Sequence, residues 1–249
     1  MSDVPFIRFP RRGDGPRVVE LAQMALQGGG DVGLLKRLAE QCERYSDDWR
    51  EVPTRRGVVP VLASMRVVDR GDGQVVGFSY CCPPIGWIVR DSGAPSFAVV
   101  KRIAAALIEI EMLAVMPRFR WRGLGGRLVA DCVERYREAG YRVAMVTVER
   151  SPAKVVSWWE REGFRFTQVA EPAYVRCWPR REGSLYGHVL PSQRLGFQGL
   201  VPGVTVQEAQ VDVPEYRCAR WGGTASGLYA ADGGLRHVRP VVEVSSLLG

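Results

Sequence analysis

The clearest hydrophobic and polar pattern of the chain is an alternation in residues 107–115, which read LIEIEMLAV. Positions 108, 110, 112 and 114 are all apolar, whereas Glu109 and Glu111 fall among the intervening positions. A period of two residues is typical of a β-strand, because successive side chains point to opposite faces. The pattern therefore predicts a strand over residues 106–115, with both glutamates on one face.

The same reading of periodicity and turn residues predicts the other elements. The predicted helices cover residues 17–26, 32–45, the stretch that follows Gly126, and 152–162, which ends before Gly163. The predicted strands cover residues 58–69, 74–82, 142–149, 164–170 and 173–178, the last two as a pair. Asp72-Gly73 suits a hairpin turn between the first two strands. Residues 99–106 fit either a short helix or the lead into a strand.

This order of elements predicts a mixed α/β fold with βαβ crossovers in its second half. The composition changes near residue 180, because residues 181–249 hold 11 of the 28 glycines. We therefore expect a domain over residues 1–180 and a glycine-rich C-terminal extension over residues 181–249. The extension is expected to form strands on the sheet edge, a small subdomain or a partly unordered tail.

The composition is that of an ordinary globular protein, with 46% hydrophobic and 24% charged residues. No apolar run approaches the ~20 residues that span a bilayer, and the first residues lack the apolar core of a secretion signal. We therefore expect a cytoplasmic protein without membrane association. The six cysteines have no CxxC spacing and the two histidines are isolated, so we expect reduced thiols and no metal site.

The net charge of +7 would suit nucleic acid or an acidic ligand. Only Lys36, Lys101 and Lys154 are lysines, and a skew towards arginine also follows from a GC-rich genome. The chain contains no recognised nucleic-acid-binding motif. An arginine-rich nucleic-acid binder is therefore the least favoured reading, and local clusters of charge carry more information.

The densest local cluster is RFRWRGLGGR, residues 118–127, directly before a helix-like pattern. The amides at a helix N-terminus are unpaired and carry partial positive charge. Gly123, Gly125 and Gly126 let the backbone approach an anion closely, and Arg120, Arg122 and Arg127 supply charge suited to phosphate oxygens. The stretch predicts a diphosphate site, and it is neither a P-loop nor a GxGxxG fingerprint.

Residues 110–129, IEMLAVMPRFRWRGLGGRLV, resemble the cofactor signature of the GNAT acyltransferase superfamily, with R-x-x-G-x-G at residues 120–125. RVAMVTVE and PAKVVSWWEREGF resemble the following strand and helix of that family. The resemblance covers about residues 58–178 and implies a mixed central sheet of the GNAT type with helices on both faces. It also implies that the pyrophosphate of acetyl-CoA lies at the following residues, with the pantetheine arm held by splayed central strands. These residues are Arg120, Arg122, Gly123, Leu124, Gly125 and Gly126, and Leu113 and Val115 would offer backbone groups to the pantetheine and thioester.

The resemblance further implies acetyl transfer to an amine, which must lose a proton although a lysine-like amine has a pKa of ~10.4. Glu109 and Glu111 are the candidate bases, and an exposed strand face or ion pairs with nearby arginines would explain them otherwise. Trp159 stands where the family often has a tyrosine that protonates the leaving thiolate. Indole is not an acid at neutral pH, so the thiolate leaves unaided or another donor, such as Tyr141, Tyr174 or a residue of the extension, replaces that tyrosine. Core packing explains at least one of Trp158 and Trp159.

The sequence thus predicts an acetyl-CoA-dependent N-acetyltransferase that acts by direct attack of a primary amine. The acceptor is a small molecule, a protein amine or an aminoacyl-tRNA, and a homodimer is compatible with this reading. The alternative is a non-catalytic, regulatory module of the same fold that binds CoA. The sequence does not identify the acceptor.

Overall fold

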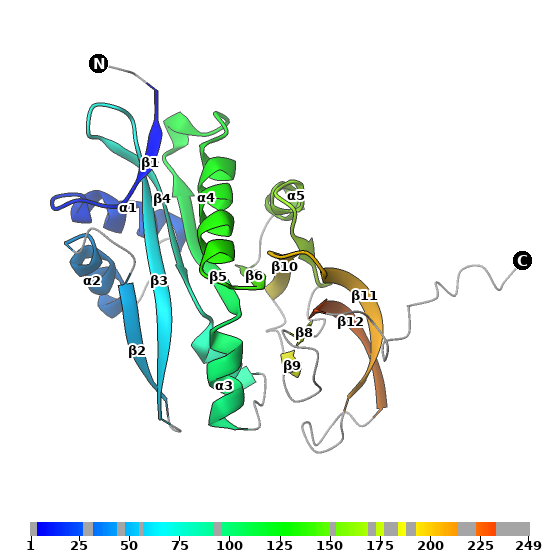
Figure 1. Cartoon of the computed structure of the whole chain (residues 1–249). Helices are drawn as coiled ribbons and strands as arrows, with labels where there is room; N and C mark the ends of the chain where they lie inside the picture. Colours follow the sequence, from blue (N-terminus) through cyan, green and yellow to red (C-terminus); the bar gives the residue numbers. More distant parts are fainter. Residues whose placement is uncertain are drawn as a thin grey trace, which may run out of the picture. The chain divides into compact units, whose positions relative to one another are not determined.

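The computed structural model describes residues 4–26, 32–43, 48–54, 57–91, 96–149, 153–168, 173–176, 184–187, 193–213 and 223–232 (Figure 1). The chain divides into two compact units, which we describe separately. The first unit comprises residues 1–83 and 108–140, and the second comprises residues 84–107 and 141–249. Among the described residues, no helix is long and apolar enough to cross a membrane.

An antiparallel sheet forms the centre of the first unit. Its strands are β1 (Phe6–Arg8), β2 (Asp48–Thr54), β3 (Gly57–Asp69), β4 (Val75–Cys82) and β5 (Leu107–Val115), in the order β1-β3-β4-β5. The short strand β2 also pairs with β3, opposite residues 57–63, whereas β1 pairs with residues 67–69. The sequence patterns predicted β3, β4 and β5 but neither β1 nor β2.

The predicted hairpin between β3 and β4 is confirmed. Met65 pairs with Tyr80, and the backbone N–H of Arg70 donates to Gln74 O at 2.9 Å. The carboxylate of Asp69 closes the turn, because its Oδ1 accepts from the N–H groups of Gly71 and Gly73 at 2.9 and 3.0 Å. Gly73 has a φ of +87°, which a glycine adopts without strain.

Helices cover both faces of this sheet, as the sequence predicted. They are α1 (Gly15–Ala25), α2 (Val32–Gln41) and α4 (Leu124–Glu138), and the short 3-10 helix η2 (Pro117–Phe119) precedes α4. Leu21 of α1 and Leu38 of α2 are buried with Phe78 of β4. Leu124 and Leu128 of α4 are buried on the opposite face, with Val76. Helix α2 ends at Gln41, and the predicted continuation over residues 44–45 lies outside the described residues.

Among its described residues, the second unit contains two groups of paired strands and two α-helices. The helices are α3 (Phe97–Ala104) and α5 (Ala153–Arg161), with a π-helix η1 at Trp87–Asp91. One group of strands is β6 (Val143–Glu149), β10 (Gln193–Gly199) and β7 (Arg165–Phe166), paired in that order. The other sheet is β11 (Val204–Val213), β12 (Gly223–Asp232), β8 (Ala173–Arg176) and β9 (Ser184–Gly187). Residues 97–104 are thus a helix, and Ser96 caps it by accepting from Val99 N at 3.4 Å.

The predicted pair of strands at residues 164–170 and 173–178 is wrong. β7 pairs with β10 from the extension, where Phe166 lies opposite Gly196, and β8 pairs with β9 and β12 instead. The side chain of Phe166 fills the space above Gly196, since a Cβ at Gly196 would lie 2.6 Å from Phe166 Cζ. β10 therefore inserts between β6 and β7 because it presents a glycine where both neighbours are bulky. The division of the chain at residue 180 stays a prediction.

Candidate functional site

The N-terminus of α4 has the geometry expected of an anion site. Gly123 is the N-cap with a φ of +72°, and no side chain caps the helix there. The helical hydrogen bonds begin where Arg127 N donates to Gly123 O at 3.0 Å. The amides of residues 124–126 therefore precede the helical ladder and carry the partial positive charge of the helix end. A donor set of successive amides with arginines alongside suits a diphosphate.

The four arginines of this loop have different surroundings. Arg120 Nε donates to Val115 O at 3.1 Å, and Arg127 Nη1 donates to Pro5 O at 2.9 Å. Arg118 Nη2 donates to Gln74 Oε1 at 3.3 Å, and the Arg122 guanidinium lies 5.6 Å from the centre of the Phe119 ring. Within the described part of the chain, none of the four pairs with a carboxylate. Their charge thus stays available for an anion, although the Arg120 side chain also holds the loop to the end of β5.

Trp121 is the residue of this loop that the sequence analysis left without a role. Its φ is +65°, which is left-handed backbone for a bulky residue, and its side chain is 93% exposed. Such a conformation costs on the order of 1–3 kcal/mol, and it persists only where the surrounding structure imposes it. The signal in the sequence was the tryptophan itself, a large aromatic residue between two arginines, just before the glycines of the turn.

A β-bulge in β5 determines where the two glutamates point. Tyr80 pairs with Met112, but the next residue of β4, Cys81, pairs with Ile110, so Glu111 is the extra residue. Residues paired across antiparallel strands point to the same face. Cys82 pairs with Glu109 and also contacts Glu111, so both glutamates lie on the face of Cys82.

The bulge corrects the predicted faces of this strand. Met112 and Ala114 are buried in the core under α1 and α2, and the partly buried Cys82 packs against the same core. Leu113 and Val115 lie on the opposite face, in the cluster under α4 that also contains Leu124. Strict alternation would have placed the glutamates with Leu113 and Val115. Because the bulge adds one residue, Glu109 and Glu111 instead share the face that carries α1 and α2.

Cys82 lies between the two candidate bases, Glu109 and Glu111, and the sequence analysis did not predict a role for it. Its Sγ donates to Glu111 Oε2 at 3.1 Å. Burial raises the pKa of the Cys82 thiol well above its usual value, and the charges of Glu111 and Glu109 raise it further. Cys82 is therefore a thiol rather than a thiolate at neutral pH. The shifted register between β4 and β5 brings this cysteine beside Glu109 and Glu111. No local sequence pattern could predict this contact.

The tryptophans of α5 are explained by packing. Trp159 is buried, and its ring makes edge contacts with Trp158 and Phe164, with centroid distances of 4.8 and 5.1 Å. This confirms that core packing accounts for one of the pair. Of the alternative acids, Tyr141 is buried, and the side chain of Tyr174 lies outside the described residues.

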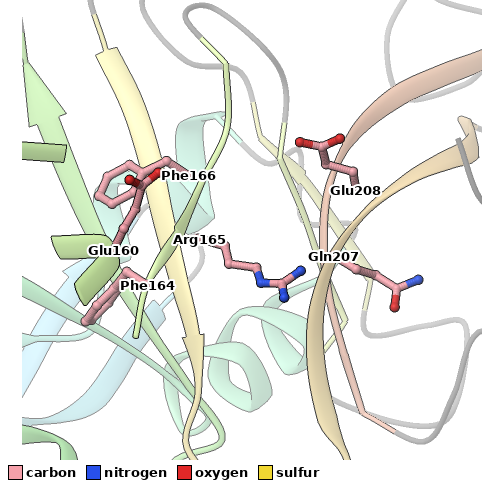
Figure 2. Close-up of a pocket in the computed structure, with 6 residues that line it drawn as sticks. All are labelled: Glu160, Phe164, Arg165, Phe166, Gln207 and Glu208. Atoms are coloured by element: carbon pink, nitrogen blue, oxygen red, sulfur yellow. The ribbon is translucent and has the colours of Figure 1, made fainter. Parts of the chain in front are cut away.

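A separate open hollow of about 600 Å³ lies in the second unit, beside the end of α5 (Figure 2). It is lined by Glu160, Phe164, Arg165, Phe166, Gln207 and Glu208. The side chain of Arg165 extends from β7 towards Gln207 on β11 (Figure 2). None of the predicted site residues lines this hollow. In the described part of the chain, no three His, Cys, Asp or Glu side chains gather in a way that could hold a metal ion.

A comparison with protein-family models identifies the class of protein. Residues 34–164, more than half of the chain, match the model described as "Acetyltransferase (GNAT) family". The chain therefore belongs to the GNAT acetyltransferase family, and its sheet with helices on both faces agrees with the fold of that family. A comparison with curated protein sequences gave no match.

Solved structures of similar fold come from several organisms. A GNAT family acetyltransferase from Elizabethkingia anophelis, with acetyl-CoA bound, is 14% identical with a TM-score of 0.46, over 80% of this chain and 99% of that one. Ard1 from Thermoplasma volcanium is 16% identical with a TM-score of 0.48, over 80% and 99%. The ribosomal-protein-S18-alanine N-acetyltransferase from Escherichia coli is 14% identical with a TM-score of 0.45, over 79% and 94%. The assignment to the family rests on the family model, not on these distant likenesses.

Proposed function

We propose that this acetyltransferase moves an acetyl group from acetyl-CoA to a primary amine by direct attack of the amine. The observation that carries the proposal is that two features lie on the same strand, β5, in the first unit. At one end, β5 leads into the Gly123 turn and the amides of α4. Further back on the same strand, Glu109 and Glu111 lie side by side next to Cys82.

The first of these features would bind the diphosphate. The amides of Leu124, Gly125 and Gly126 point out of the helix start, and Arg122 adds an exposed cation. Helix amides and guanidinium groups both donate to phosphate oxygens, so the residues present fit the diphosphate of acetyl-CoA. The backbone of Leu113 and Val115 is proposed for the pantetheine and thioester. The carbonyl oxygen of Val115 already accepts a hydrogen bond from Arg120 Nε. Val115 would therefore offer its N–H to the cofactor, or its hydrogen bond with Arg120 would break when the cofactor binds.

The second feature would handle the proton. Acetyl-CoA supplies the acetyl group as a thioester, whose carbonyl carbon the neutral amine nitrogen attacks. Glu109 or Glu111 accepts the proton that the amine loses, directly or through one water. A carboxylate pair also attracts the protonated amine before it reacts. The thiolate of CoA departs when the carbon–sulfur bond breaks, and Trp159 is not its proton donor, because indole does not ionise in the useful range.

The test separates binding from turnover. Calorimetry should show that CoA binds the wild-type protein and that a folded Gly125→Val variant binds it far more weakly, because the valine side chain would crowd the diphosphate. A panel of small amines, peptide amines and aminoacyl-tRNA, monitored by release of the CoA thiol, should then identify an acceptor.

Three results are distinguishable. Absence of CoA binding by the wild-type protein would contradict the proposal. Tight CoA binding without turnover on any amine would favour the non-catalytic module that the absent tyrosine at position 159 suggests. Turnover that survives in the double variant Glu109→Gln, Glu111→Gln would show that the carboxylates are structural. A cytoplasmic location and a homodimer stay predictions.

A further inference from the structure

Trp121 is an exposed aromatic side chain on strained backbone, placed inside the proposed diphosphate loop. Its indole is 93% exposed, and its φ is +65°. It stands between Arg120, which donates to Val115 O, and Arg122, which lies over the Phe119 ring. The two flanking arginines are thus anchored to the body of the first unit, whereas the indole extends into solvent.

Neither folding nor packing explains this residue. A side chain that is almost fully exposed buries little apolar area, so it gives the fold little stability. A glycine at position 121 would adopt the same backbone without strain. Strain that brings no folding benefit is found mostly at ligand sites and other functional positions. The indole is therefore expected to contact something that the folded chain itself does not provide.

From this placement we propose that Trp121 stacks on the adenine ring of CoA. The inference rests on the proposed function, which places the diphosphate at the amides of residues 124–126. In CoA the diphosphate is joined through one ribose to adenine, so the base lies one ribose away from the phosphates that the loop would hold, within reach of a large side chain of that loop. Adenine offers a flat π surface, and indole is the largest aromatic side chain that can cover it. Trp121 is thus a binding residue for the nucleotide end, away from the reacting thioester.

The alternative occupant of an exposed tryptophan is the surface of a protein partner. Nothing in that case would couple Trp121 to the adenosine part of the cofactor. The experiment therefore compares two ligands, CoA and 4′-phosphopantetheine. The second ligand lacks the adenosine, its 3′-phosphate and one of the two phosphates of the diphosphate. It uses the wild-type protein, Trp121→Phe, which keeps a ring, and Trp121→Gly, which removes the ring and suits the backbone.

Calorimetry should show that Trp121→Gly weakens CoA binding by about tenfold, a typical loss for one stacked base. The affinity for 4′-phosphopantetheine should stay the same, because this ligand has no adenine for the indole to contact. Trp121→Phe should keep an intermediate affinity for CoA. CoA should also quench tryptophan fluorescence in the wild-type protein, and this quenching should largely disappear in Trp121→Phe.

Two outcomes overturn the inference while leaving the proposed function intact. In the first, Trp121→Gly changes the affinities for both ligands by the same factor. In the second, it leaves CoA binding unchanged, as expected for an indole that contacts a protein partner. A wild-type protein that binds neither ligand would overturn the inference and the proposed function together. Arg137→Gln is a matched control, because Arg137 lies in the last turn of α4 and pairs with Glu134, away from the start of the helix, and it should alter neither affinity.

Discussion

The thiol of Cys82 donates to the carboxylate of Glu111 across the β-bulge, with 3.1 Å between Sγ and Oε2. Cys82 also pairs in register with Glu109, so a single thiol lies next to both candidate bases. A protonated thiol that donates to a carboxylate restricts the rotation of that carboxylate. The arrangement therefore gives Cys82 a positioning role beside the proposed amine site, and it makes the reactivity of this thiol a measure of the neighbouring charges.

The first prediction concerns that reactivity. Because burial and the charges of Glu111 and Glu109 raise the pKa of Cys82, its alkylation by iodoacetamide at pH 8 should be slow. Glu111→Gln removes one of these charges, so the alkylation rate of Cys82 should rise several-fold, as measured by mass spectrometry of its peptide. Cys42 is the internal control, since burial raises its pKa to about 12 and Glu111 is not among the causes. An unchanged rate at Cys82 would show that the Glu111 charge does not reach the thiol.

The second prediction concerns the carboxylates themselves. Replacing the true base with glutamine should lower turnover by about 100-fold or more, since general bases contribute roughly 10²–10⁴-fold. The acidic limb of the pH–rate profile should disappear in that variant and persist in the other. Cys82→Ser keeps a hydrogen-bond donor and should retain more activity than Cys82→Ala. If Glu109→Gln, Glu111→Gln, Cys82→Ser and Cys82→Ala all kept the activity of the wild-type protein, this result would contradict a catalytic role for the two carboxylates.

The third prediction separates backbone conformation from binding at α4. Gly123 and Gly140 lie at opposite ends of the helix, with φ values of +72° and +87°, and a Cβ at either would meet nothing within 4 Å. Alanine at either position should therefore lower the free energy of unfolding by about 1 kcal/mol through backbone strain alone. Only Gly123→Ala should also weaken CoA binding, because Gly123 directs the amides that follow it. Equal CoA affinity of the two variants would contradict a diphosphate site at this turn.

The fourth prediction concerns stability and pH. Arg8 Nε donates to Asp69 Oδ2 at 2.8 Å, in a buried ion pair that also includes Asp14. Burial alone would raise the pKa of Asp69, but the N–H groups of Gly71 and Gly73 and the Arg8 charge outweigh it and lower that pKa. A lowered folded-state pKa stabilises the fold above the unfolded value of ~3.9, and this stability is lost as the pH falls through the folded-state pKa.

Asp69→Asn should therefore lower the free energy of unfolding by about 3 kcal/mol near pH 7, as measured by urea denaturation. The difference from the wild-type protein should shrink as the pH falls below ~4. Asp72→Asn is the matched control in the same turn, because Asp72 is exposed, forms its ion pair with Arg70 at the surface and accepts from the N–H of Gln74. If Asp69→Asn lowered the free energy of unfolding by the same amount at every pH, the charge of Asp69 would not contribute to stability.

The fifth prediction tests the insertion of β10. At Gly196 an added Cβ would lie 2.6 Å from Phe166 Cζ and 2.8 Å from Val146 Cγ2. Gly196→Ala should destabilise the protein by roughly 1–3 kcal/mol, because both neighbours must shift. Gly77→Ala is a milder comparison, with its nearest contact at 3.1 Å to Ala114 O. An unchanged melting temperature for Gly196→Ala would contradict the pairing of β10 with β6 and β7.

The sequence by itself determined the elements that depend on local chemistry. The hairpin of β3 and β4 follows from apolar runs around Asp72-Gly73, and α4 follows from a regular apolar stripe that begins just after Gly123. The proposed diphosphate loop is local too, because glycines and a helix start suffice to predict it. Residues 110–129 therefore carried both the prediction of the anion site and the resemblance to the GNAT family.

Only the tertiary structure decided what depends on strand register and on partners far away in the chain. The bulge at Glu111 arises from the pairing of β4 with β5, and it moves Glu109 and Glu111 to the face opposite Leu113. The same register brings Cys82 to the carboxylates. β10 lies between β6 and β7 because Gly196 fits against Phe166, although 30 residues separate the two along the chain. Periodicity reports the face of a strand only while the alternation is unbroken, and it does not report which strand lies next to it.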